Sequence, residues 1–153
     1  MIDRKTFADQ ARTWVGTKFH HQGRLKKTHN SCGGCDCIGL LIGVIKELSL
    51  EKTIGCDNID CIDKRDYRRI VTTPVLIDTI KQYFREKKSC FLEVGDIALF
   101  CFKNSTYPHH IGIVNEICGD LTLIHSFVQA GCVVEHILDE YWLDSVHSIY
   151  TID

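Results

Sequence analysis

The sequence lacks any long apolar run: no segment approaches the roughly 18 residues that a membrane-spanning helix requires. It also lacks a basic stripe, since the net charge is −2 and the nearest cluster of cations is Arg24, Lys26 and Lys27 in a polar loop. No internal repeat or low-complexity segment is visible. These absences argue against a transmembrane protein, against a nucleic-acid partner and against a repeat architecture.

A secretory signal is missing as well, because no apolar stretch follows the charged N-terminal residues 1–5. We therefore expect a protein that stays in the cytoplasm or leaves by a route that needs no signal peptide. With 153 residues and an apolar fraction of 44%, the chain is long enough to bury a core of its own. We expect one domain over residues 1–153.

Cysteine, in contrast, is abundant, with nine residues. The number is odd and the spacing is irregular, which in a chain without an export signal indicates free thiols rather than a disulfide framework. We expect most of these thiols to be small core residues. Cys90, Cys101, Cys118 and Cys132 are included in that expectation, because they lie in or beside apolar stretches.

Helical patterns dominate the first half of the chain. Asp3 can cap a first helix that Gly16 ends, and residues 37–48 are apolar almost all round, as in a buried central helix. Residues 49–72 look irregular and polar. Thr73 and Pro74 then open a third helix as an N-cap and a first-turn proline.

The second half has the period-two pattern of strands. Turn residues separate five such segments, which are residues 96–102, 110–117, 121–127, 132–138 and 146–152. Helices followed by strands indicate an α+β domain. We predict N-terminal helices and a buried central helix packed on a five-stranded, mostly antiparallel sheet.

The start of the central helix carries the strongest chemical signal. Asp36 is a good N-cap, and Cys37 then lies in the first turn, where unpaired N–H groups and the helix dipole favour a thiolate. The backbone N–H of Cys37 could also hold an oxyanion. Gly39 and Gly43 share one helical face at a cost of about 1 kcal/mol each. We expect the sheet to press on that face and bring a histidine near Cys37.

Two histidines interrupt apolar strands, where a polar ring needs a partner. A tight turn at residues 119–120 would leave His110 and His125 about 13 Å apart. A wider loop over residues 116–120 would set them directly opposite, so that His125 could orient His110. We predict the wider loop. His109 points the other way on a strand and is expected at the surface.

Four stretches together resemble a known family. They are ARTWVGT at 11–17 with FHHQG at 19–23, GCDCIGL at 34–40, VGDIALF at 94–100, and HIGI at 110–113 with IH at 124–125. In this order and spacing, which span most of the chain, they resemble the NlpC-type cell-wall peptidases, a papain-like family. The resemblance is greatest to the phage-type branch, which is found beside tail assembly genes.

The resemblance implies a cysteine peptidase with Cys37 as nucleophile, His110 as base and His125 as the orienting residue. In this family the aspartate at the position of Asp36 helps to hold a free amine of the peptide. Members typically cleave the bond between D-γ-glutamate and a diamino acid in peptidoglycan stems. Phage-type members ride on tails and open the wall during DNA entry. The reading requires no cofactor and no metal.

Two positions depart from the family pattern. Ile38 stands where a serine usually follows the nucleophile, and Phe19 lies where a tyrosine hydroxyl is common. His21 is a candidate to substitute for that hydroxyl in part. These changes bear on the substrate more than on the nucleophile, so we group Asp36, Phe19, His21 and Ile38 as substrate-binding candidates.

Three other readings stay open. Cys32 and Cys35 have zinc-like spacing, and His20, His21, His29 and Cys37 are nearby in sequence. Alternatively, Cys35 could resolve a sulfenic acid on Cys37 in a thiol redox protein. A non-catalytic structural subunit of a tail or wall complex could also retain the fold.

Overall fold

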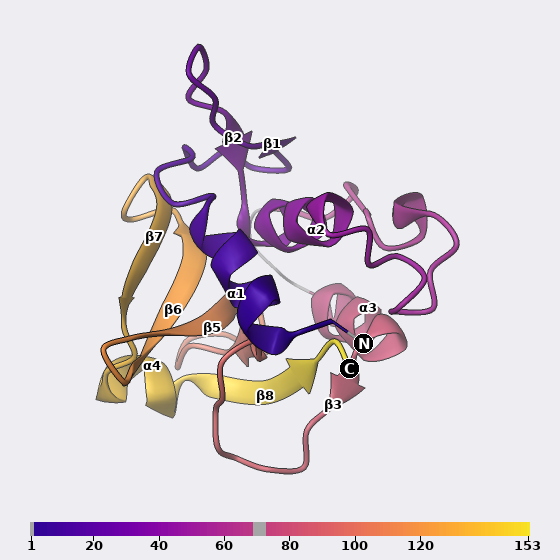
Figure 1. The fold of residues 1–153 in the computed structure, drawn as a ribbon. Helices are drawn as coiled ribbons and strands as arrows, with labels where there is room; N and C mark the ends of the chain where they lie inside the picture. Colours follow the sequence, from indigo (N-terminus) through magenta and orange to yellow (C-terminus); the bar gives the residue numbers. More distant parts are fainter. Residues whose placement is uncertain (1, 69–72) are drawn as a thin grey trace.

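The computed structural model describes residues 2–68 and 73–153. Helices lie on both sides of a twisted sheet, and a small hairpin projects from one end (Figure 1). The helices are α1 (Arg4–Arg12), α2 (Cys37–Glu47), α3 (Val75–Tyr83) and α4 (Glu140–Asp144), with a 3-10 turn η1 (Ile59–Cys61). The strands are β1 (Arg24–Leu25), β2 (Gly34–Cys35), β3 (Arg85–Glu86), β4 (Ile97–Phe100), β5 (His110–Ile117), β6 (Asp120–Phe127), β7 (Cys132–Ile137) and β8 (Val146–Thr151).

The main sheet is antiparallel throughout and has the order β3-β8-β4-β5-β6-β7. The five strands that the sequence predicts form its centre and one edge. The sixth strand, β3, was missed because it has only two residues and both are exposed, which leaves no alternating pattern to read. The architecture is a mixed helix and sheet domain, and the prediction of five strands was one short.

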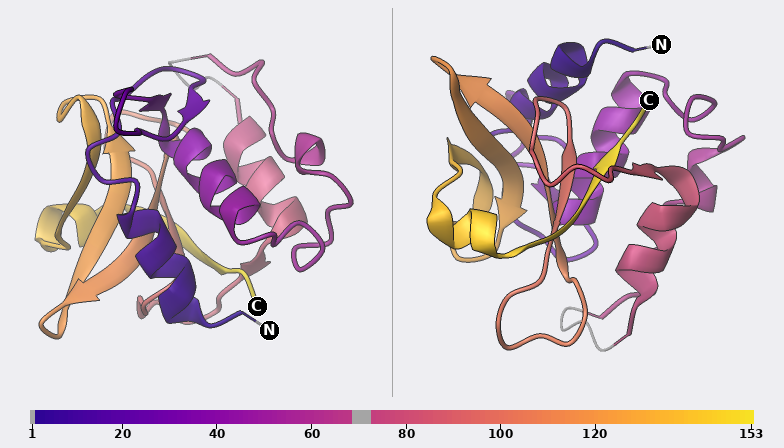
Figure 2. Two further views of the ribbon diagram at one scale, coloured as in Figure 1. Left: turned by 45° about the horizontal axis from the view of Figure 1, so that its top comes forward. Right: turned by 90° about the horizontal axis from the view of Figure 1, so that it is seen from below.

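Each face of the sheet carries its own core. The larger one joins α1, α2 and α3 to the sheet through residues such as Phe7, Leu40 and Ile80. The smaller one, built around Phe100 and Trp142, lies under α4 on the other face. Figure 2 shows α2 and α3 on one side of the strands and α4 on the opposite side. In the part of the chain that the structure describes, no helix has the length and apolar character to cross a bilayer.

The N-caps of two helices are the residues that the sequence predicts, and the N-cap of a third differs. Asp3 caps α1 by accepting from the N–H of Thr6 at 3.0 Å, and Asp36 caps α2 by accepting from the N–H of Gly39 at 2.8 Å. The prediction at α3 was wrong by one position, since Pro74 itself is the N-cap and makes no side-chain cap hydrogen bond. Within the segment predicted to be irregular, residues 69–72 lie outside the described residues.

The small residues of α2 have a different role from the one we expected. A Cβ on Gly39 would overlap the carbonyl oxygen of Gly23, and a Cβ on Gly43 would overlap the ring of Trp14. The glycine face is thus pressed by the loop before β1 and by the residues after α1, not by the sheet. The expectation of sheet contact at this face was wrong. The lack of a side chain at Gly39 instead lets the start of α2 pack directly on the backbone at Gly23.

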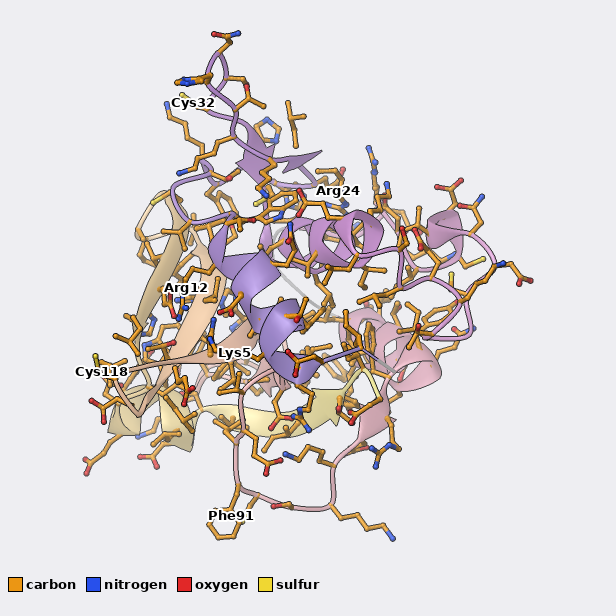
Figure 3. The ribbon with its side chains drawn as sticks, viewed as in Figure 1. Lys5, Arg12, Arg24, Cys32, Phe91 and Cys118 are labelled. Atoms are coloured by element: carbon orange, nitrogen blue, oxygen red, sulfur yellow. The ribbon has the colours of Figure 1, made fainter. Side chains whose placement is uncertain are left out.

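The expectation that most thiols are core residues was also wrong. Only Cys35 and Cys56 are buried, while Cys32, Cys61, Cys90 and Cys118 are exposed. Figure 3 shows Cys32 out on the projecting hairpin and Cys118 at the turn between β5 and β6. Cys37 at the start of α2 is partly buried, as are Cys101 and Cys132 at strand ends. The apolar stretches do form strands, but these cysteines lie at the strand ends or beyond them, where side chains reach solvent.

Candidate active site

Cys37 is the first residue of α2, and its side chain packs at the edge of the main core. Burial, and to a smaller extent the neighbouring Asp36 carboxylate, raise the pKa of its thiol to about 12. Backbone N–H groups of Ile111, Ile38 and Cys37 itself act in the opposite direction but do not outweigh burial. The helix start therefore does not produce the thiolate that its position suggested, because removing a charged sulfur from water costs more than the dipole returns.

His110 and His125 are in direct contact. Nε2 of His110 lies 2.7 Å from Nδ1 of His125, and both residues are buried. Burial lowers the pKa of His110 to about 3 and that of His125 to about 2, so both rings are neutral at physiological pH.

The predicted register between these strands was wrong. Ile117 pairs with Asp120, which leaves a two-residue turn at Cys118 and Gly119 instead of a wide loop. The observed pairing also differs from the one that a tight turn at 119–120 would give. That turn would pair His125 with Val114, whereas the observed register, continued along the strands, places His125 opposite Gly112, two residues away. The two histidines are consequently diagonal neighbours, a relationship that still lies within reach of long side chains.

Cys37 and His110 line the same cavity. Both line a space of about 680 Å³, and the sulfur lies close enough to the backbone N–H of Ile111 for that group to lower the thiol pKa. Among the described residues, no hydrogen bond joins the Cys37 sulfur to the His110 ring. Hydrogen bonds between a nucleophile and its base are often long or poorly aligned in the absence of substrate.

The cavity has an apolar floor and a charged rim. The floor comes from α2, α3 and the strand ends, and includes Leu41, Ile42, Leu76, Ile80, Ile111 and Phe127. The rim carries Lys64, Asp66 and Arg68. His109, which we expected at the surface, is half-buried and lines the same cavity, with its ring 5.1 Å from that of Phe102.

Asp36 lies at the centre of a buried polar cluster. Besides the N–H of Gly39, its carboxylate accepts from the N–H of Gln22 at 2.8 Å and from Arg24 Nη1 at 3.1 Å. The hydroxyl of Tyr67 donates to it as well. Arg24 emerges from β1 beside the start of α2 in Figure 3. Four donors of the chain thus occupy a carboxylate that is 4% exposed.

Tyr67 is a residue that the sequence analysis missed. Its hydroxyl sits against Asp36, and burial raises its pKa, so the group stays protonated as a donor. The segment that holds it has no periodic pattern, so nothing local in the sequence pointed to the site. A hydroxyl is therefore present beside Asp36 even though Phe19 supplies none.

The other predicted substrate-binding residues gather around the same space. Phe19, His21 and Ile38 all line the cavity with Cys37. The ring of His21 meets the ring of Tyr67 edge-on, with centroids 5.5 Å apart. The structure thus brings the predicted substrate-binding residues to the cavity that Cys37 and His110 line, and it places His125 in contact with His110.

A third histidine joins the pair and was also missed. Nε2 of His136, on β7, lies 2.8 Å from Nε2 of His125. His136 pairs with Leu123 across the strands, whereas His125 pairs with Val134. Because this contact is again diagonal, it depends on a register that the sequence did not reveal.

The cysteines on which the zinc and redox alternatives depend differ in their exposure to solvent. Cys32 is exposed on the hairpin, whereas Cys35 is buried and its thiol pKa is raised to about 12 by burial. Across residues 2–68 and 73–153, no three histidine, cysteine or acidic side chains are grouped as a metal site. The redox alternative rests on Cys35 and Cys37, which lie on either side of Asp36 in the chain.

No protein-family model matches the sequence, and no curated protein sequence matches it either. Several solved structures do resemble it. A crystal structure described as an N-acetylmuramoyl-L-alanine amidase from Bacteroides uniformis superposes with a TM-score of 0.58 at 13% identity over 96% of both chains.

Two further structures extend the likeness. NlpC2 from Trichomonas vaginalis has a TM-score of 0.58 at 17% identity, covering 99% of this chain and 47% of that one. The crystal structure of Ly7917 has a TM-score of 0.57 at 14% identity, covering 98% and 62%. The fold is accordingly that of the NlpC and amidase structures, and this chain spans about half of the Trichomonas protein.

Proposed function

We propose that the protein is a cysteine hydrolase of peptidoglycan stem peptides, with Cys37 as nucleophile, His110 as base and His125 as the residue that orients His110. The observation that carries this proposal is the cavity that holds Cys37 at a helix start together with a buried, hydrogen-bonded histidine pair. The likeness in fold to an amidase and to NlpC proteins supports it.

In this proposal the resting enzyme holds a thiol and a neutral imidazole. Nδ1 of His110 takes the thiol proton as the sulfur attacks the amide carbonyl, and the backbone N–H of Cys37 donates to the developing oxyanion. The same proton then passes to the departing amine, which leaves a thioester on Cys37. A water molecule hydrolyses the thioester, giving up its proton through His110 and returning the thiol.

For the substrate we propose the D-γ-glutamyl–diamino acid bond. A γ-linked glutamate carries a free α-carboxylate beside the bond. Of the three charged side chains on the rim of the cavity, Lys64 and Arg68 are cations and only Asp66 is an anion. The apolar floor suits the aliphatic parts of such a stem.

The remaining candidates shape the pocket in this proposal. Phe19, His21 and Ile38 form walls next to the nucleophile. Since four donors already occupy Asp36, a substrate amine would bind there by displacing one of them. Two of the four are backbone N–H groups, so the replaceable donors are the side chains of Arg24 and Tyr67. We further propose that the protein acts at the cell wall, where a phage tail or tail-like particle would carry it.

The experiment is digestion of purified muropeptides, read by mass spectrometry. The wild-type protein should release fragments with a new amine on the diamino acid, and a Cys37→Ala variant should release none. Cys118→Ser is a matched control, because that thiol is exposed at a turn remote from the cavity. Equal cleavage by the Cys37→Ala variant would overturn the proposal.

A second candidate is a non-catalytic wall or tail subunit that retains the fold. Two observations favour it: within the described residues no hydrogen bond links Cys37 to His110, and burial keeps the thiol protonated. Such a protein would bind muropeptides without changing their mass. Binding by the wild type and by Cys37→Ala alike, with no cleavage by either, would select this candidate.

A further inference from the structure

Three histidines from three neighbouring strands form one continuous hydrogen-bonded line. His110 on β5 contacts His125 on β6 at 2.7 Å, and His125 contacts His136 on β7 at 2.8 Å. At the far end, Nδ1 of His136 lies 2.8 Å from the carbonyl oxygen of Ile137. The line therefore runs from the cavity to a backbone group on the edge strand of the sheet.

The carbonyl at the end of this line fixes where each proton resides. A carbonyl oxygen only accepts, so Nδ1 of His136 carries its proton, and its Nε2 is bare when the ring is neutral. Nε2 of His125 must then donate to that bare nitrogen, which leaves Nδ1 of His125 as an acceptor. Nε2 of His110 donates to it in turn. The unprotonated nitrogen of His110 is thus Nδ1.

Packing against one tryptophan restrains all three rings. Trp142 is the buried residue of α4, and its ring lies against all three imidazoles. The centroid distances are 6.1 Å to His110, 4.7 Å to His125 and 5.2 Å to His136. The side chain of His125 is fully buried, so water cannot replace a lost partner. Without an acceptor at position 136, a protonated Nε2 on His125 would be an unsatisfied buried donor.

We propose that His136 is a positioning residue that sets the tautomer of His125 and, through it, that of His110. This inference rests on the proposed function, in which Nδ1 of His110 receives the thiol proton. If His136 is lost, His125 relieves its unsatisfied donor by moving the proton to Nδ1. Nε2 of His110 must then be bare, its proton moves to Nδ1, and that nitrogen can no longer act as a base.

The first test is spectroscopic and needs no substrate. Nitrogen-15 shifts and long-range couplings of labelled histidine distinguish the two neutral tautomers of each ring. In the wild-type protein, we expect a proton on Nε2 of His110 and of His125, and on Nδ1 of His136. A wild-type His125 with its proton on Nδ1 would overturn the inference whatever the variants do.

Variants extend the test. His136→Phe should move the proton of His125 to Nδ1, whereas His136→Gln supplies an amide oxygen as acceptor and should keep the wild-type pattern. His147→Phe is the matched control, since its ring is exposed on β8. Thermal unfolding shows whether each variant folds. If His136→Phe does not fold, the test rests on His136→Gln, whose spectrum should show the wild-type tautomers.

Kinetics separate this inference from the proposed function. If muropeptides are cleaved, His136→Phe should lower kcat about 10- to 100-fold with little change in KM, and His136→Gln should restore most of it. An unchanged kcat in His136→Phe would overturn the positioning role while leaving the hydrolase proposal intact. Absence of cleavage by the wild type, with the tautomers as expected, would instead overturn the hydrolase proposal.

Discussion

Nε2 of His110 lies 2.7 Å from Nδ1 of His125, although the two residues are not opposite each other in the sheet. Continuing the β5–β6 register places Gly112, not His110, across from His125. The imidazoles meet across this diagonal, and Phe127 and Trp142 pack against both rings. The pair is therefore a product of side-chain packing as much as of strand pairing.

The burial of Cys37 predicts slow alkylation. Because the pKa of its thiol is raised to about 12, nearly all of it is protonated at pH 7.5, and the reactive thiolate fraction grows about tenfold for each pH unit up to that value. Iodoacetamide should label the exposed Cys32 and Cys118 well before Cys37. Peptide mapping by mass spectrometry at pH 7.5 and 9.5 measures the order. Labelling of Cys37 first at pH 7.5 would show a resting thiolate instead.

The buried histidines predict acid sensitivity. Their folded pKa values, about 3 for His110 and about 2 for His125, lie below the ordinary value of about 6.5, so the unfolded chain binds the protons more tightly. Their contribution to stability is complete above pH 6.5 and is lost as the pH falls towards 3. Each histidine should lower the free energy of unfolding by up to about 1.4 kcal/mol per pH unit in that window.

Urea unfolding at pH 7 and pH 5 measures this dependence. The variant His125→Gln removes one of the two groups and should show a smaller loss between these pH values. His147→Gln changes an exposed ring and serves as the control. A wild-type protein with equal stability at both pH values would contradict the expectation.

The close approach at Gly39 predicts a large effect of a single methyl group. A Cβ there would overlap the carbonyl oxygen of Gly23, so Gly39→Ala must displace the loop or the start of α2. We expect a loss of roughly 3 kcal/mol, in the upper range for overpacked sites. Gly55→Ala is the comparison. Its Cβ would meet open space, so the expected loss of stability is about 1 kcal/mol and comes from the positive φ of 71° alone. Equal unfolding free energies for the two variants would refute the close approach.

The buried ion pair of Asp36 predicts a cost for removing one charge. Arg24 and Asp36 have side chains only 7% and 6% exposed, and Asp36→Asn would leave the guanidinium with Asp63 as its remaining carboxylate partner. A loss of roughly 3 kcal/mol is expected. Asp9→Asn should cost less than about 1 kcal/mol, because that carboxylate is 47% exposed beside Lys5. Urea unfolding of both variants tests the contrast.

The positions of the main elements were evident from the sequence alone. Period-two stretches became β4 to β8, and the almost wholly apolar segment from Cys37 became the buried α2, because these patterns reflect which side chains must leave water. Asp3 and Asp36 identified the starts of two helices, since a carboxylate satisfies N–H groups within its own turn. The candidate site residues were chosen by their type, by their place on these elements and by the family resemblance.

Tertiary structure decided how those residues relate to one another. The register of β5, β6 and β7 set the line from His110 to His136. The turn that fixes the β5–β6 register lies at Cys118 and Gly119, one position earlier than the turn that the sequence suggested. Packing also determined the protonation of Cys37, because desolvation depends on what surrounds the sulfur and not on its position in a helix. The sequence by itself determined which groups are present, whereas contacts between distant segments decided their protonation states and partners.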